Sequence, residues 1–255
     1  MFASERRKQI IQLLNKNNAI SVNEVAQELD VSKPTIRTDF DFIVETHQNI
    51  ERTHGGLVLL SSDLRYTKYD DRRSINMLQK QAIADEAFKL IENKTTLLLD
   101  SSSTCYELAQ RLVESDLQVT VITNGLNTGM LLKENPNLTV ILIGGLLKPR
   151  SNTTQDEFDS GVFNYFNIDI YFFSASSVSF SSGFTDYNIY EIKSKREYIT
   201  RSRKTVALID SSKINDPSNS SFAKLEDVAL MITDSNISDE DLKSFKSRIA
   251  IQTAQ

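Results

Sequence analysis

Residues 21–45 read SVNEVAQELDVSKPTIRTDFDFIVE and predict two short helices joined by a tight turn. Ser21 and Glu24 have the spacing of a capping box, in which the hydroxyl and the carboxylate each accept a hydrogen bond from an otherwise unpaired backbone N–H. Apolar residues then recur at helical spacing in both halves, so each helix has one inward stripe. These residues are Val22, Val25, Ala26 and Leu29 in the first helix and Ile36, Phe40 and Ile43 in the second. The stretch therefore predicts either a helix-turn-helix or a plain two-helix corner of a helical domain.

The second predicted helix has polar residues on its outward side. Ser32 is a favourable cap for this helix, and Pro34 suits its first turn. In a helix-turn-helix, the N-terminal residues of the second helix lie against base edges in the major groove of DNA. The residues expected in that position are Lys33, Thr35, Arg37 and Thr38.

The segments on either side complete a winged helix. Residues 5–15 (ERRKQIIQLLN) predict a first helix, and residues 50–60 (IERTHGGLVLL) predict a hairpin, with the Gly-Gly pair supplying the positive φ of its turn. Three helices closed by a two-stranded wing would bind double-stranded DNA. Arg6 on the first helix, and Arg52 and His54 on the wing, are further candidate DNA contacts.

Three of these motifs resemble the N-terminal signature of DeoR-type transcriptional regulators: ERRKQII, SVNEVAQELDVSKPTIRTD and RTHGG. The resemblance implies a regulator, a repressor of a carbohydrate operon, that binds operator DNA. One position departs from the family pattern, because Thr38 stands where a second arginine usually follows the one at Arg37. The operator sequence is therefore not transferable from the family.

The charge of the predicted DNA-binding module is nearly balanced. The whole chain carries a net charge of −5, and residues 1–60 contain seven Lys and Arg against eight Asp and Glu. Affinity for DNA then depends on how the charges are arranged and on several modules acting together, which favours a homodimer or homotetramer. The cations expected to share one face are Arg6, Arg7, Lys8, Lys33, Arg37 and Arg52.

Composition argues against several other classes of protein. No run of 18 apolar residues predicts a transmembrane helix, and the N-terminal residues lack the apolar core of a signal peptide. A single cysteine, Cys105, rules out an internal disulfide and suits a reducing cytoplasm, where it is expected to be a small buried side chain. With two histidines and no Cys-His cluster, we expect no metal site and no cofactor.

The rest of the chain predicts an α/β domain. Residues 61–73 are polar and aperiodic and are interpreted as a linker, which divides the chain into domains at 1–60 and 74–255. A helix is expected from Ser74 to Asn93. Short apolar runs separated by helical stretches then predict a parallel sheet covered on both faces. These runs are 95–100, 118–123, 139–144, 168–174, 205–210 and 228–233.

Polar residues follow most of the predicted strands. In an open parallel sheet the carboxyl ends of the strands share one crevice, which is the usual ligand site. Hydroxyls, glycine N–H groups and helix N-termini suit a phosphate, and carboxylates suit sugar hydroxyls. The alternative is that these residues are only turn residues and helix caps. The clusters are 100–104, 123–125, 144–145, 174–177 and 210–213, with Arg150 and Lys195 as further cations.

The resemblance to DeoR-type regulators continues in the second predicted domain. The matching positions are LLLDSSST, TNGLN, the glycine pair Gly144-Gly145, Glu191, Lys195 and DSSK. The resemblance implies a fold like that of sugar-phosphate isomerases and CoA-transferases, and a phosphorylated sugar or polyol as effector. The phosphate residues that it implies are Ser103, Thr104, Asn124, Gly144, Gly145 and Lys195; the sugar residues are Asp100 and Asp210. The other candidate effector residues are Ser102, Thr123, Arg150, Glu191 and Lys213. Two stretches depart from the family pattern, Ser174–Ser177 and the residues after Arg150.

Two functional classes fit this organisation. One is a transcriptional regulator that senses a phosphorylated sugar, and the other is an isomerase-like enzyme. An aldose–ketose isomerase needs a carboxylate base beside the substrate carbons, and Asp100, Asp156, Glu191 and Asp210 are candidates. No spacing singles out one of them, and catalysis would leave the winged helix unexplained, so the sequence favours the regulator.

Overall fold

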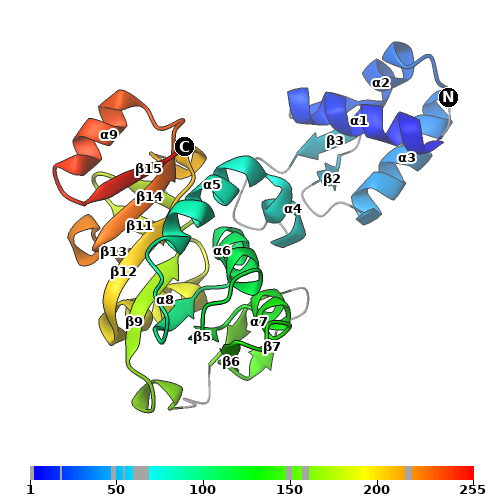
Figure 1. Ribbon diagram of the computed structural model, residues 1–255. Coiled ribbons are helices and arrows are strands. Elements are labelled where there is room, and N and C mark those ends of the chain that lie inside the picture. Colours follow the sequence, from blue (N-terminus) through cyan, green and yellow to red (C-terminus); the bar gives the residue numbers. More distant parts are fainter. Residues whose placement is uncertain are drawn as a thin grey trace. The chain divides into compact units, whose positions relative to one another are not determined.

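The computed structural model describes residues 3–17, 19–46, 50–53, 55–59, 69–147, 151–156, 161–215 and 220–255. The chain forms two compact units, Met1–Thr67 and Lys68–Gln255. Figure 1 shows helices and a small sheet in the first unit, and a larger sheet flanked by helices in the second. Each unit is described by itself.

The first unit is a winged helix. Its helices are α1 (Ala3–Asn17), α2 (Val22–Glu28) and α3 (Lys33–Thr46), and its strands are β1 (Ala19–Ser21), β2 (Ile50–Arg52) and β3 (Gly56–Leu59). The strands form an antiparallel sheet in the order β1-β3-β2, so the wing has one strand more than predicted. The predicted capping box is confirmed, with Ser21 Oγ accepting from Glu24 N at 3.1 Å. The inward stripes meet in one core around Ile10, Val25, Ile36, Phe40 and Ile43.

The glycines of the wing have a different role from the one predicted. Gly55 and Gly56 are not among the residues with positive φ. Gly56 instead pairs with Ser21, and a Cβ at this position would lie 2.1 Å from the carbonyl oxygen of Ile20. Position 56 therefore requires glycine because two backbones approach closely, and not because of its φ angle.

The second unit is built on a parallel sheet of seven strands in the order β15-β14-β12-β9-β4-β5-β6. The strands are β4 (Thr96–Leu99), β5 (Val119–Thr123), β6 (Leu138–Leu142), β9 (Ile168–Phe173), β12 (Ser202–Leu208), β14 (Leu230–Asp234) and β15 (Ile251–Ala254). The first six correspond to the predicted apolar runs, whereas β15 was not predicted. The parallel sheet is confirmed.

Apolar residues on both faces of the sheet are buried, as the unbroken apolar runs predict. Leu97 and Leu99 of β4 pack on one face, with α5 (Met77–Phe88), α6 (Ser103–Val113) and α7 (Leu126–Leu132). Leu98 packs on the other face, with α8 (Ile189–Arg201) and α9 (Asp239–Lys246). Neighbouring residues of one strand thus belong to two separate cores, which is the pattern of a doubly covered sheet.

Smaller elements complete the second unit. Helix α4 (Tyr69–Ser74) occupies residues that were interpreted as linker, and α5 is shorter than the helix predicted from Ser74 to Asn93. The remaining strands are β7 (Leu146–Leu147), β8 (Thr154–Gln155), β10 (Ser177–Ser179), β11 (Gly183–Asp186) and β13 (Ser220–Ala223). Three short 3-10 helices are η2 (Val162–Asn164), η3 (Ser211–Lys213) and η4 (Leu225–Asp227).

Candidate DNA interface and effector site

Helix α3 presents the predicted polar side to solvent. Lys33, Arg37 and Thr38 are exposed and Thr35 is half-buried, because Ile36 and its partners turn the opposite side into the core. Thr38 Oγ1 donates to the carbonyl oxygen of Pro34 at 3.2 Å, which leaves its methyl group and oxygen lone pairs at the surface. The N-terminal half of α3 is therefore available for the groove contacts expected of a recognition helix.

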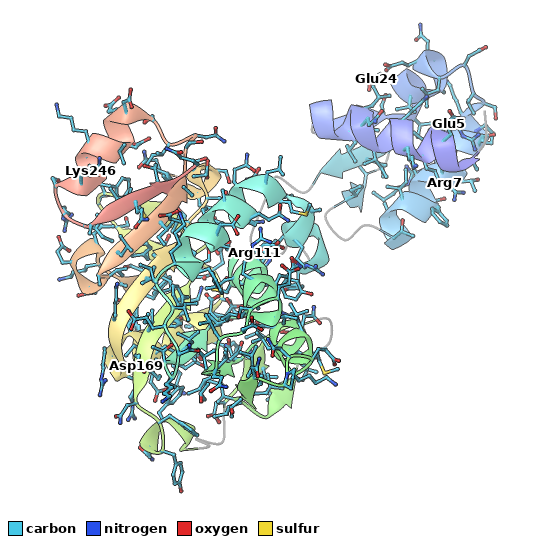
Figure 2. The ribbon with its side chains drawn as sticks, in the orientation of Figure 1. Glu5, Arg7, Glu24, Arg111, Asp169 and Lys246 are labelled. Atoms are coloured by element: carbon cyan, nitrogen blue, oxygen red, sulfur yellow. The ribbon has the colours of Figure 1, made fainter. Side chains whose placement is uncertain are left out.

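Two arginines of α1 are held within the unit. Arg6 Nε and Arg7 Nε lie 2.5 and 2.8 Å from the two carboxylate oxygens of Asp39, a buried residue of α3. The Arg7 guanidinium (labelled in Figure 2) also lies over the ring of Phe42, 3.7 Å from the ring centroid. The predicted DNA contact of Arg6 is therefore disfavoured, since its side chain is only 11% exposed. A buried carboxylate needs such partners, because an unpaired buried charge is costly.

Arg52 of the wing also has partners within the unit. Its Nε lies 3.0 Å from Asp41 Oδ1, and its Nη1 donates to Gly56 O at 3.3 Å. The guanidinium stands over the ring of Phe40, 5.1 Å from its centroid. The Arg52 side chain nevertheless stays 30% exposed, so part of it is available to a phosphate. The candidate His54 lies outside the described residues.

In the second unit, Asp100 joins the ends of two central strands. It follows β4 and is 3% exposed. Its Oδ1 accepts from Ser102 N at 3.0 Å, and its Oδ2 accepts from Ser174 N, just after β9, at 2.9 Å. The carboxylate therefore stabilises the turn into α6 and fixes the spacing of the strand ends around the crevice.

Lys195 of α8 lies beneath the same crevice in a cluster of carboxylates. Its Nζ donates to Asp186 Oδ2 at 2.7 Å and to Ser174 O at 2.8 Å. Asp100 and Glu191 lie farther away, at 3.7 and 3.9 Å from the same Nζ. The resemblance implied a phosphate contact for Lys195, but its charge is already matched within the protein. This geometry favours a structural role for Lys195, because an anion would have to compete with three carboxylates.

The electrostatics of this cluster follow from burial and pairing. Burial alone would raise the pKa of Asp186, but the charge and hydrogen bond of Lys195 outweigh it and hold that pKa below its ordinary value. Burial raises the pKa of Glu191, and the negative charge of Asp186 raises it further. Burial would lower the pKa of Lys195, but the surrounding carboxylates raise it instead. Lys195 therefore stays protonated.

A second polar group lies at the end of β12. Lys213 Nζ donates to Ser174 Oγ at 2.9 Å and lies 3.7 Å from Asp210 Oδ2. Asn76, between α4 and α5, donates from Nδ2 to Asp210 Oδ1 at 3.1 Å and to Ser212 Oγ at 2.9 Å. Burial would raise the pKa of Asp210, but Lys213 and the hydrogen bonds lower it below its ordinary value. Ser174 thus connects the group around Lys213 with the group around Lys195.

Several predicted residues act mainly as caps and turn residues. Ser102 Oγ accepts from Cys105 N at 3.2 Å and caps α6, whereas Ser103 and Thr104 are buried in its first turn. Thr123 Oγ1 accepts from Gly125 N at 3.0 Å. Ser102 thus serves as a helix cap and Thr123 as a turn residue, and their part in effector binding stays a prediction. Thr104 Oγ1, in the first turn of α6, and Asn124 Oδ1, directly after β5, are buried and have no hydrogen-bond partner among the described residues.

The glycine pair contacts the segment that crosses the ends of β5 and β6. Gly144 has φ +99°, and a Cβ there would lie 3.0 Å from Thr154. Gly145 N donates to Gln155 O at 3.0 Å. These residues order the loop beside Asn124, whose carbonyl oxygen accepts from Thr154 N at 2.8 Å. The candidate Arg150 lies outside the described residues.

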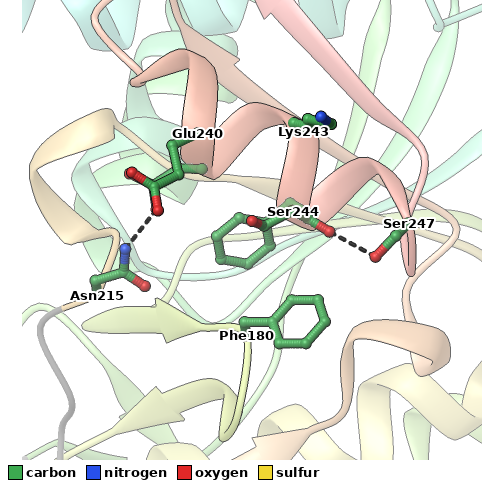
Figure 3. A pocket seen from close by; sticks show the side chains of 8 residues that line it. Phe180, Asn215, Glu240, Lys243, Ser244 and Ser247 are labelled. Atoms are coloured by element: carbon green, nitrogen blue, oxygen red, sulfur yellow. Dashed lines mark hydrogen bonds between the residues drawn. The ribbon is translucent and has the colours of Figure 1, made fainter.

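A separate hollow lies along α9 (Figure 3). Its walls include Phe180, Phe245 and Lys243. Polar groups in it bond to one another: Asn215 Nδ2 donates to Asp241 Oδ1 at 2.6 Å, and Ser247 Oγ donates to Ser244 O at 2.7 Å. None of the residues predicted to bind the effector lines this hollow, so we place the candidate site at the strand ends.

The structure adds residues that the sequence did not single out. Asp186, the closest carboxylate to Lys195, belongs to the small sheet formed by β10, β11 and β13. Asn76 lies outside every predicted cluster, yet it bonds directly to Asp210. Neither residue follows an apolar run of the main sheet, so strand-end position gave no signal for them.

Two features typical of other classes of protein, a membrane-spanning helix and a metal-ligand cluster, do not occur among the described residues. No helix there is both long and apolar enough to span a membrane. The same residues contain no group of three or more His, Cys, Asp or Glu side chains arranged to hold a metal ion.

A winged helix followed by a parallel α/β unit with polar side chains gathered at its strand ends is the organisation of a two-domain transcriptional regulator. Residues 6–63 match the DeoR-like helix-turn-helix domain, and residues 75–235 match the DeoR C-terminal sensor domain. The chain therefore belongs to the DeoR family of transcriptional regulators.

Two bacterial relatives agree with this assignment. The chain is 41% identical over 246 residues to the HTH-type transcriptional regulator GolR of Listeria innocua, with 96% of each chain covered. It is 31% identical to the glycerol-3-phosphate regulon repressor of Haemophilus influenzae, over 91% of this chain and 90% of the relative. Among solved structures, a D-ribose-5-phosphate isomerase in complex with phospho-erythronic acid matches 54% of this chain and 53% of its own, with 19% identity and a TM-score of 0.39.

Proposed function

We propose that this DeoR-family regulator represses a carbohydrate operon and releases or retains its operator according to the binding of a phosphorylated sugar or polyol. The observation that carries the proposal is the joint presence of an exposed α3 side with Lys33 and Arg37 and of a strand-end crevice with cations and carboxylates. The similarity to a glycerol-3-phosphate regulon repressor supports the same class of effector.

Within the crevice we propose distinct roles for the cations and the polar groups. Lys213 is the more accessible lysine, with 23% of its side chain exposed against 7% for Lys195. Lys213 therefore suits an anionic group of the effector. Asn124 and Thr104, which hold unpartnered buried oxygens, suit effector groups that donate hydrogen bonds.

A panel of ligands tests the effector class on the full chain. Thermal melting would be measured with triose, pentose and hexose phosphates, glycerol 3-phosphate, and the unphosphorylated counterparts. A ligand at about 100 times its dissociation constant stabilises a protein by about 2.7 kcal/mol, which is a readily measured shift. We expect shifts with phosphorylated compounds only. Equal shifts with unphosphorylated sugars, or none with any compound, would contradict the proposed effector class.

The DNA function is tested in the same preparation. DNA sequences would be selected from a random pool by the full chain, and the selected site titrated with and without each ligand that shifts melting. The expected result is a paired half-site that a homodimer or homotetramer contacts, since helix-turn-helix proteins usually read two half-sites. Failure to enrich any sequence would contradict the proposal.

We further propose that the protein acts in the cytoplasm and performs no catalysis. The winged helix has no role in an enzyme of this kind. Asp100 and Asp186, two of the buried carboxylates at the strand ends, are already bonded to backbone N–H groups and to Lys195. A turnover assay with the phosphorylated panel checks this. Interconversion of an aldose phosphate and a ketose phosphate, lost in Glu191→Gln, would instead support an isomerase.

A further inference from the structure

Helix α4 is the first helix of the second unit, and it packs beside the crevice. The Tyr69 ring meets the ring of Tyr106 edge-on, with centroids 6.3 Å apart, and the Arg73 guanidinium lies over Tyr106 at 4.1 Å. Tyr106 is in the first turns of α6, which begins directly after the end of β4. Helix α4 is therefore anchored next to the strand ends.

Lys80 and Asn76 bind this helix to the crevice. Lys80 is 3% exposed, and its Nζ donates to Ile75 O at 2.6 Å and to Arg72 O. Burial, aided by the charge of Lys213, lowers the pKa of Lys80 to about 8. Asn76, with φ +52°, bonds to Asp210 and Ser212. The carbonyl end of α4 is thus fixed by contacts that lead to the strand-end groups.

Arg72 of α4 differs from the other cations around the crevice. Lys195 has three carboxylates within 4 Å and Lys213 has Asp210. Arg72, by contrast, forms no ion pair with a described residue, and its buried Nε, like that of Arg73, has no hydrogen-bond acceptor among them. Its positive charge also acts on Glu191 of α8, lowering the pKa that burial raises. Arg72 thus has hydrogen-bonding capacity still unused, on a helix whose contacts lead to the strand-end groups.

We propose that Arg72 binds the phosphate group of the effector and makes α4 a wall of the effector site. A guanidinium donates two parallel hydrogen bonds to a phosphate, and a buried Nε without an acceptor gains a partner when the anion binds. This inference rests on the proposed function, because it names a residue for the phosphate of that effector. It also gives the regulation a physical route: α4 begins at Tyr69, two residues after the DNA-binding unit ends at Thr67.

The test compares Arg72→Gln with Arg73→Gln in the full chain. Both variants lose one positive charge from the same helix, and both guanidinium groups have a buried Nε without an acceptor. Arg73, however, lies over the Tyr106 ring, whereas the charge of Arg72 acts on Glu191. Isothermal titration would use inorganic phosphate and the phosphorylated compounds of the panel. Arg72→Gln is expected to weaken binding of both at least tenfold, and Arg73→Gln to change it less than threefold. Equal affinities of Arg72→Gln and the wild type would overturn the inference.

Arg72→Lys separates the hydrogen bonds from the charge. It keeps one positive charge but loses the paired donors, so its affinity should fall between the wild type and Arg72→Gln. Arg72→Lys also replaces Arg72→Gln as the test variant if Arg72→Gln does not fold, because it retains the positive charge. If Arg72→Lys then binds the phosphorylated compounds as tightly as the wild type, the bidentate contact is overturned. Melting temperatures without ligand, and binding to the selected DNA site without ligand, should match the wild type for Arg72→Lys.

The outcomes distinguish this inference from the proposed function. A wild type that binds no phosphorylated compound refutes both. Binding by the wild type with equal binding by Arg72→Gln refutes the role of Arg72 alone. If Arg72 binds the phosphate, the ligand concentration that produces half of the full change in DNA binding should rise in Arg72→Gln by the same factor as the dissociation constant for the ligand. The reason is that a ligand shifts the equilibrium between two conformations only through its different affinities for them.

Discussion

Helices α3 and α8 both carry cations, but in opposite environments. Lys33 and Arg37 of α3 are exposed, and Arg37 has a buried apolar residue, Ile36, as its neighbour. Lys195 of α8 points inward and is surrounded by Asp186, Asp100 and Glu191. The first arrangement suits a partner that arrives from solvent, and the second builds its own partners into the fold.

The difference decides what each cation contributes. An exposed charge in water interacts weakly with its neighbours and adds little to stability, so it can serve a polyanion such as DNA. A buried charge is stabilised only when its partners stay in place, and removal of one partner leaves the others unpaired. We therefore expect substitutions in α3 to change binding and substitutions around Lys195 to change folding.

The largest expected effect is that of Lys195→Ala on stability. The change leaves Asp186 and Asp100 buried without their cation, which costs about 3–5 kcal/mol when one partner of a buried pair is removed. Chemical denaturation of the ligand-free protein measures it. Lys193→Ala, an exposed position on the same helix, is the control and should be nearly neutral. A stable Lys195→Ala protein with weakened ligand binding would support a phosphate contact of Lys195. It would contradict the difference proposed between the cations of α3 and α8.

Arg37→Ala should change DNA binding and leave folding intact. Loss of a bidentate guanine contact costs about 1–3 kcal/mol and relaxes specificity at one position, whereas loss of a phosphate contact weakens all sequences alike. Gel-shift titration at fixed salt, with the selected site and single-base variants, measures both. Lys243→Ala on α9 removes the same charge from the second unit and should bind DNA normally. Unchanged affinity of Arg37→Ala would remove this residue from the interface.

Gly56→Ala tests whether the wing depends on a close backbone contact. The new Cβ would lie 2.1 Å from Ile20 O, so β1 and β3 must move apart. Overpacking of this kind costs about 1–3 kcal/mol. Gly55→Ala is the matched control, since its Cβ would meet nothing within 4 Å. Thermal melting of both variants measures the difference in stability. Equal melting temperatures would show that the strands adapt to the added methyl group.

The smallest effect expected is a change in the acid dependence of stability in Asp186→Asn. The pKa of Asp186 is lowered below its ordinary 3.8, so its contribution is present above that pH and is lost as pH falls through the folded value. The variant should melt below the wild type at pH 7, and the gap should narrow below about pH 4. Calorimetry from pH 7 to 3 measures the gap. A gap that is constant with pH would show that Asp186 acts through packing alone.

Local patterns in the sequence were sufficient for most elements. The inward stripes of α2 and α3, the capping box at Ser21 and six of the seven parallel strands depend on neighbours within a few residues, and the structure agrees with them. The exposure of Lys33 and Arg37 follows from the same periodicity, because a helix that buries Ile36 must turn those side chains outward. The strand-end clusters also came from position alone, since parallel strands end at one edge.

Side-chain partners across the fold were decided only by the tertiary structure. Lys195 was expected to face a phosphate, but the packing of α8 against β11 places Asp186 2.7 Å from its Nζ. Arg6 was expected at the DNA, but the crossing of α1 and α3 brings it to Asp39. Arg72 fell in a predicted linker because a six-residue helix is too short to show a clear period. A buried charge takes whatever partner the packing provides, and residues far apart in the chain leave no local signal of that choice.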